Sequence, residues 1–242
     1  MIKLRKGPQP AVLSRNGEPW KAEYQQALAA GKRRSDIPAR YRHPEIKEAV
    51  RAESFDKCLY CETKISHAQF GDVEHIVPIS AKPEDVVTWE NLGYVCQVCN
   101  NKKRDYWDES CPLLNPYHED PNDHILFLGP WVMHRPGDER GRVTARRLHL
   151  NRSALMERRK ERLDRIAALL DEIALMPPGP AKTAMLEYLR EETSKSTEYS
   201  GAASALVSIY LHDGMNGGAA STHLTRPSAE AALSPSAVDS GC

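Results

Sequence analysis

Apolar residues recur at helical spacing in two parts of the N-terminal region. The segment 18–30 carries a stripe with a spacing of four residues, and a second stripe follows a proline within 43–54. Spacings of three and four place side chains on one face of a helix, and proline is common in the first turn of a helix. We therefore expect residues 1–56 to be mostly helical after an irregular start. The stripes consist of Trp20, Tyr24 and Leu28 and of Ile46 and Val50.

The clearest helical pattern covers 152–175 and ends at the sequence PPGP. Its apolar residues fall mainly at steps of three and four, and they are Leu155, Leu163, Ile166, Leu170 and Ile173. We expect further helices over 181–193 and 203–211. The segment 111–150 is rich in turn signals, which predicts irregular structure. From Asp213 onward the chain is rich in Gly, Ala, Ser and Thr and has no aromatic residue, which predicts a disordered tail over 213–242.

One short segment has the pattern of a β-strand. The sequence DVEHIVPIS, at 72–80, is rich in β-branched residues, and Pro78 either ends the strand or places it at a sheet edge. We interpret 81–96 as a loop with a short turn and expect a helix from Gln97 through Arg104.

Composition restricts the class of protein. The chain has 242 residues with 33 basic and 33 acidic side chains, so its formal net charge is zero. That length allows one substantial domain or a small domain with additions. Zero net charge argues against a uniformly basic nucleic-acid-binding protein, so any electropositive surface must be local. Basic clusters occur at 31–34, 101–104, 145–147 and 158–162.

No apolar run approaches the roughly 20 residues of a membrane helix, and the first residues lack the apolar core of a secretion signal. We therefore expect a cytoplasmic protein. In that setting cysteines favour metal binding over disulfides.

Two C-x-x-C pairs, Cys58 with Cys61 and Cys96 with Cys99, provide the strongest chemical signal. Each pair can bind one side of a tetrahedral ion through two thiolates, and the two pairs together predict a closed, structural zinc site with four cysteine ligands. The zinc would join two distant parts of a small domain. The residues between them, which include Asp72, Glu74, His75 and Asn91, would then be held over a fixed base.

The succession of C-x-x-C, E-H-x-x-P, N-L and C-x-x-C-N-x-x-K over 57–104 resembles the HNH endonuclease family. The resemblance implies a ββα-metal unit, a β-hairpin followed by a helix. It identifies His75 as the general base, Glu74 and Asn100 as ligands of a catalytic divalent cation, and Asn91 as the residue that fixes the loop. Glu in place of the common Asp, and Asn in place of the last His, are departures from the commonest pattern.

The resemblance further implies hydrolysis of a nucleic-acid phosphodiester to a 5′ phosphate and a 3′ hydroxyl. Oxygen ligands favour Mg²⁺ or Mn²⁺. Lys102, Lys103 and Arg104 follow Asn100 by about one turn and are expected to contact neighbouring phosphates. Asp72, two residues before Glu74 on the same side of a strand, is a reserve ligand.

A wider succession, from MIKLRKGPQPAVL through LLNPYHEDP to LHLNRSALMERR, is similar to PtuB-type HNH nucleases of Septu and retron anti-phage systems. That resemblance covers roughly 1–175. It implies an ABC-type ATPase partner, PtuA, and an intracellular nucleic-acid substrate, with DNA expected and RNA as the alternative. The docking surface is expected in the N-terminal segment or the helix 152–175.

We therefore predict an α+β fold with four parts. These are a mostly helical segment (1–56), a zinc-stapled HNH core (57–110), an irregular segment with C-terminal helices (111–212) and a disordered tail (213–242). Two other interpretations remain open. A non-catalytic zinc module binding nucleic acid or protein would need only the cysteines, and a stand-alone restriction-type nuclease would use the same chemistry without a partner.

Overall fold

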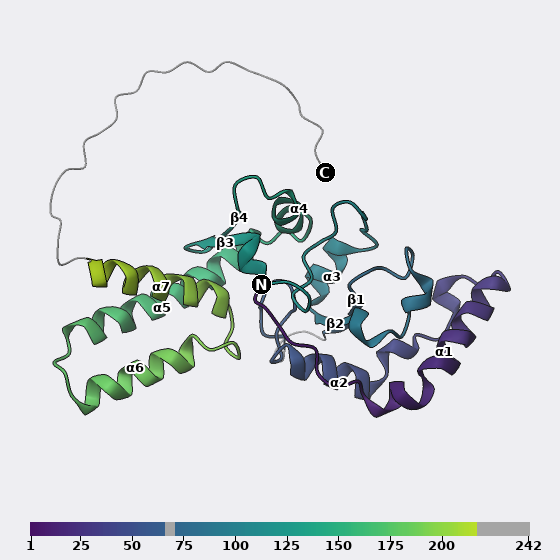
Figure 1. The fold of residues 1–242 in the computed structure, drawn as a ribbon, viewed down its shortest axis with the longest axis horizontal. Helices are drawn as coiled ribbons and strands as arrows, with labels where there is room; N and C mark the ends of the chain where they lie inside the picture. Colours follow the sequence, from purple (N-terminus) through teal and green to yellow (C-terminus); the bar gives the residue numbers. More distant parts are fainter. Residues whose placement is uncertain (66–70, 217–242) are drawn as a thin grey trace, which may run out of the picture.

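A computed structural model describes residues 1–65 and 71–216, and the tail predicted beyond residue 216 lies outside them. Helices α1 (Ala11–Ala29) and α2 (Pro44–Glu53) form the N-terminal region, as predicted. Helix α1 begins nine residues before Trp20, the first residue of the apolar stripe. In Figure 1 these helices lie on one side of a small hairpin-and-helix unit, and a layer of three longer helices lies on the other side. Short 3-10 helices cover Arg34–Asp36, Arg40–Arg42, Pro83–Asp85, Trp89–Asn91 and Pro121–Asp123.

The hairpin-and-helix unit consists of strands β1 (Asp72–His75) and β2 (Leu92–Val95), which pair antiparallel, and helix α3 (Gln97–Lys103). Glycine at position 93 lets the Leu59 side chain lie close to β2, because a Cβ there would lie 2.8 Å from that side chain. This unit confirms the predicted ββα core. The prediction of a loop over 92–95 was wrong, because all four residues of β2 are buried and the sequence shows no alternation.

The expectation of irregular structure over 111–150 was also wrong in part. Strands β3 (Ile125–Leu128) and β4 (Trp131–His134) form a second hairpin around Gly129, which has a φ of +57°. Helix α4 (Glu139–Arg147) follows, with the Asp138 side chain capping its first turn. Four-residue strands are too short for a clear alternation. Helix α4 is too polar for an apolar stripe, so neither gave a sequence signal.

The C-terminal helices were predicted correctly in number and order. They are α5 (Ser153–Leu175), α6 (Pro180–Glu192) and α7 (Ser200–Asn216), and α6 and α7 each pack on α5 (Figure 1). Helix α7 continues through 213–216, so the tail does not begin at Asp213 as expected. A small apolar cluster joins the three helices, and it contains Ile166, Leu170, Ile173, Leu189 and Ala203.

The main apolar core crosses three of the predicted segments. It joins Leu13 and Ile46 of the N-terminal helices to Leu92 of β2, and it continues into Ile125 and Leu163. Each fully buried aliphatic side chain of this kind contributes about 1.5–3 kcal/mol relative to an exposed one. The hairpin-and-helix unit is therefore held by a core to which both halves of the chain contribute.

Candidate active site and metal centre

The four predicted cysteines converge into one buried cluster. Their sulfur atoms all lie within 4.8 Å of one another, and Cys61 Sγ is 3.8 Å from Cys96 Sγ. Thiolates around a tetrahedral ion with bonds of about 2.3 Å would stand about 3.8 Å apart, so the cluster fits such an ion. Hydrogen bonds among the thiols, that with Cys58 first, hold the pKa of Cys61 well below its usual range. The predicted four-cysteine metal site is confirmed as a cluster.

A guanidinium accompanies the thiols. Arg152 lies 3.7 Å from Cys61 Sγ and 3.9 Å from Cys99 Sγ, and it comes from the residue just before helix α5. A tetrathiolate carries excess negative charge around a divalent ion, so this cation partly balances the cluster. No sequence pattern indicated this role, because Arg152 lies more than fifty residues after Cys99, the last of the four clustered cysteines.

The side chain of Glu74 points toward helix α3. Its Oε1 accepts a hydrogen bond of 2.6 Å from Lys103 Nζ, and the same ammonium donates to the backbone oxygen of His75 at 2.8 Å. Burial raises the pKa of Glu74, and Lys103 opposes that rise. Among the described residues none donates a hydrogen bond to the second oxygen, Oε2.

Asp72 and Glu74 leave β1 on the same side, as strand alternation requires. Asp72 Oδ2 accepts a hydrogen bond of 2.9 Å from Asn100 Nδ2. Asn100 therefore approaches the hairpin through the reserve residue Asp72, and no hydrogen bond joins Asn100 to Glu74 among the described residues. The three side chains nevertheless meet on one face, between β1 and α3.

His75 is the last residue of β1, next to Glu74, and its side chain contacts the loop that precedes β2. Its Nε2 lies 2.8 Å from the backbone oxygen of Val86, and its ring meets the Tyr41 ring edge-on at 4.4 Å between centroids. Burial lowers the pKa of His75 to about 4, so the imidazole is neutral at neutral pH. The contacts from Tyr41 and Val86 were not predicted, because only the tertiary fold brings these residues to the strand.

Asn91 closes the loop that carries Val86. Its Oδ1 accepts from Val77 N at 2.7 Å, its Nδ2 donates to Val77 O at 2.9 Å, and its backbone oxygen accepts from Ile76 N at 2.9 Å. These bonds fasten the end of the loop to the residues just after β1. The loop-fixing role that the family resemblance implied for Asn91 agrees with this geometry.

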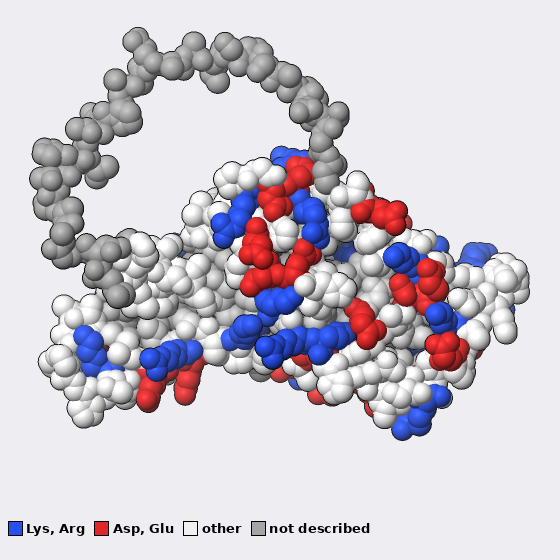
Figure 2. Space-filling model, in the orientation of Figure 1, with Lys and Arg blue, Asp and Glu red and all other residues white. Residues whose placement is uncertain are grey.

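The three basic residues after Asn100 differ in exposure. Lys102 and Arg104 are exposed, whereas Lys103 has a side chain only 1% exposed. The expectation that Lys103 contacts a phosphate therefore needs correction, because its ammonium already binds Glu74 and His75 inside the unit. Figure 2 shows basic and acidic side chains interspersed on one face of the molecule, in keeping with the zero net charge.

Known proteins resemble this chain most specifically over the residues that carry the site. Residues 58–105 match the model of the HNH endonuclease family. The chain is 35% identical to a Septu protein PtuB of Bacillus thuringiensis over 109 residues, which cover 45% of this chain and 42% of that protein. It is 23% identical to a Septu protein PtuB of Bacillus mycoides strain KBAB4 over 246 residues, covering 87% of this chain and 82% of that protein.

The matched length and the character of the helices complete this description. The match to the first relative spans less than half of that protein's length. Within the described residues, no helix combines the length and apolar character needed to cross a membrane. Residues 58–105 therefore match an HNH endonuclease domain, and the curated homologues of the chain include proteins named Septu protein PtuB.

Proposed function

We propose that the chain is a metal-dependent HNH endonuclease that hydrolyses nucleic-acid phosphodiester bonds and acts in anti-phage defence in the cytoplasm. The observation that carries the proposal is the match of residues 58–105 to the HNH family on a β1–β2–α3 unit with a four-cysteine cluster at its base. We propose Zn²⁺ as the ion of that cluster, since four buried thiolates form a closed tetrahedral site with no open position.

His75 is the proposed general base. Its Nε2 faces a carbonyl oxygen, which can only accept a hydrogen bond, so this nitrogen carries the ring proton and Nδ1 keeps its lone pair. A neutral imidazole in that tautomer can take a proton from water at Nδ1. The Tyr41 ring and the Val86 carbonyl hold the imidazole in place, and Asn91 fastens the loop that presents the carbonyl.

Glu74 and Asn100, together with Asp72 between them, are the proposed holders of the catalytic cation. Carboxylate and amide oxygens are the ligands that Mg²⁺ and Mn²⁺ prefer. When bound, such a cation offsets the charge of the scissile phosphate and of the leaving oxygen. Lys103 is a positioning residue here, because it holds Glu74 Oε1 and leaves Oε2 for the ion. The products would carry a 5′ phosphate and a 3′ hydroxyl.

The proposal also includes a protein partner. The relatives are named for Septu, and an ABC-type ATPase is the proposed partner of this chain. The helices α5 and α7 expose large apolar side chains, among them Leu175, Ile209 and Leu211, and Figure 2 shows few charged side chains over this part of the face. Co-expression with an ABC-type ATPase encoded beside the gene, followed by co-purification, tests the partnership.

A nicking assay tests the catalytic proposal. Plasmid DNA and RNA are incubated with the zinc-loaded chain, with and without Mg²⁺ or Mn²⁺ and with and without the ATPase. We expect cleavage that requires the cation and is abolished by His75→Ala, while zinc content and circular dichroism stay unchanged. Cleavage by the variant at the wild-type rate would remove His75 as the base. Binding without cleavage by the wild-type chain under every condition would favour the non-catalytic zinc module.

A further inference from the structure

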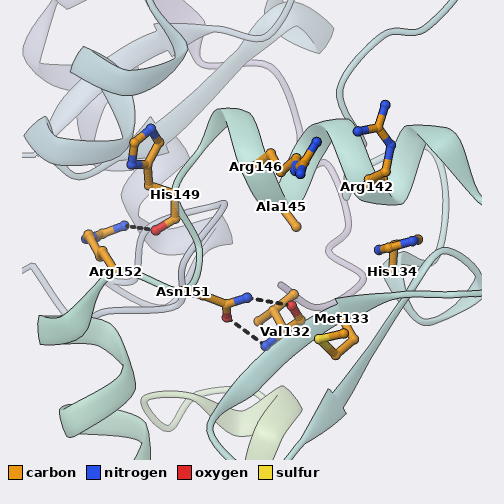
Figure 3. A pocket seen from close by; sticks show the side chains of 9 residues that line it. All are labelled: Val132, Met133, His134, Arg142, Ala145, Arg146, His149, Asn151 and Arg152. Atoms are coloured by element: carbon orange, nitrogen blue, oxygen red, sulfur yellow. Dashed lines mark hydrogen bonds between the residues drawn. The ribbon is translucent and has the colours of Figure 1, made fainter. Parts of the chain in front are cut away.

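A basic pocket lies outside the HNH unit. It has a volume of about 390 Å³ and opens between strand β4, helix α4 and the turn that leads into α5 (Figure 3). Asn151 closes one wall, because its side chain hydrogen-bonds both the nitrogen and the oxygen of Val132 at 2.8 Å. The outer edge of β4 is thereby covered next to the pocket.

Nitrogen-bearing side chains dominate the lining. They are His134, Arg142, Arg146, His149 and Arg152, and no described residue that lines the pocket carries a carboxylate. Arg142 is paired with Glu139 on the same helix, and Arg152 faces the thiols. Arg146 is exposed and has no carboxylate of a described residue within ion-pair distance. Arg146 is therefore the arginine of the described lining whose charge is left without a carboxylate or thiol partner, and a positive charge in a pocket without carboxylates favours an anion.

Two contacts connect the pocket to the HNH unit. Arg152 lines the pocket and also approaches Cys61 and Cys99, so the metal cluster and the pocket share a side chain. Arg147, next to Arg146 on α4, stacks over Tyr106, three residues beyond the end of α3, with 4.9 Å from guanidinium to ring. The exposed Lys102 and Arg104 lie at that same end of α3. Basic groups thus extend from the candidate active site toward the pocket.

We propose that this pocket binds a backbone phosphate of the nucleic-acid strand that the HNH unit cuts, at a position other than the scissile one. The inference rests on the proposed nuclease function and adds a substrate contact outside residues 58–105. Arginine side chains suit a phosphate because their planar donors match its oxygens. The contact positions the strand and reads no base, so it contributes affinity without sequence preference.

Binding is measured by fluorescence anisotropy with a labelled oligonucleotide. The full, zinc-loaded chain carries His75→Ala so that the strand stays intact, and single-stranded DNA, duplex DNA and RNA are separate arms. The test variants are Arg146→Gln and Arg142→Gln/Arg146→Gln. The matched control is Arg190→Gln, which removes one exposed positive charge from α6. Arg146→Lys is the conservative variant.

We expect Arg146→Gln to weaken binding about tenfold in at least one arm, since a charge-assisted bond to phosphate is lost. The slope of log affinity against log salt should fall by about one, as for one lost phosphate contact. Arg146→Lys should recover part of the affinity, and Arg190→Gln should change neither quantity. Equal affinities of Arg146→Gln and Arg190→Gln in all arms, with unchanged melting curves, would overturn the proposal.

A free nucleotide is the other source of phosphate. If ATP binds the wild-type chain and Arg146→Gln abolishes that binding while leaving oligonucleotide affinity intact, the pocket is a nucleotide site and the proposal is wrong. The test of the phosphate pocket can be separated from the test of nuclease activity. A wild-type chain that never cuts, but loses affinity on Arg146→Gln, refutes only the catalytic proposal.

Discussion

Replacement of Lys103 with Met tests the interior of the candidate site. Lys103 Nζ lies 2.6 Å from Glu74 Oε1, with side-chain exposures of 1% and 10%. The variant keeps the length of the side chain but leaves a buried carboxylate unpaired and removes the donor to the His75 carbonyl. Removing one partner of a buried ion pair costs about 3–5 kcal/mol. Because whole domains are stable by about 5–15 kcal/mol, the loss is a large fraction of the total.

The assays are urea denaturation and thermal denaturation, each followed by circular dichroism, in buffer without Mg²⁺. Lys102→Met is a control in the adjacent residue, whose side chain is exposed, and it should shift stability by less than about 0.5 kcal/mol. The thermal midpoint of Lys103→Met should fall by roughly 6–20 °C for a chain of this size. A Lys103→Met/Glu74→Gln double variant should recover part of the loss, because no charge remains unpaired.

The pH dependence gives the reasoning a second test. Burial already raises the pKa of Glu74 above 4.5, and Lys103 opposes the rise, so its removal raises this pKa further. A carboxyl with a raised folded-state pKa binds protons more readily in the folded state, so stability falls as pH rises above its unfolded value. The deficit of Lys103→Met should therefore be largest at neutral pH and shrink toward pH 4.5. A deficit that matches Lys102→Met at every pH would show that the ion pair does not form.

Two further predictions concern the metal cluster and its neighbourhood. Cys96→Ser should remove bound zinc and unfold the unit, because structural zinc contributes about 10–16 kcal/mol in small domains, as much as the stability of a whole fold. Metal analysis and melting curves check this expectation. A variant that lacks zinc but melts like the wild type would contradict it. Burial raises the pKa of Glu62, but the ammonium groups of Met1 and Lys57 outweigh burial and lower it from 4.5 to about 2. The stability it contributes is present above pH 4.5 and is lost as pH falls toward 2. Glu62→Gln should therefore be less stable at neutral pH and should lose about 3 kcal/mol less on acidification over that range, as urea curves at several pH values would show. An acid profile identical to that of the wild type would contradict the ion pairs.

The sequence by itself determined the cysteine cluster and the order of the candidate site residues along the chain. Paired C-x-x-C spacing requires little more than local geometry, because each pair binds one side of an ion wherever the chain brings the pairs together. The long helix 152–175 was equally predictable, since its stripe repeats over many turns. Strand alternation alone placed Asp72 and Glu74 on one side of β1, and the Asn100 and Lys103 contacts agree with it.

Only the tertiary structure decided which basic side chains are exposed and which are buried in ion pairs. Lys102 and Lys103 are indistinguishable as neighbours in sequence, yet the turn of α3 exposes one and buries the other against Glu74. Strand β2 and the hairpin β3–β4 were missed because short strands that are buried or irregularly patterned carry no period. The contacts of Tyr41 and Val86 with His75, and of Arg152 with the thiols, join residues distant in sequence. Such pairings depend on how the whole core packs, which no local pattern encodes.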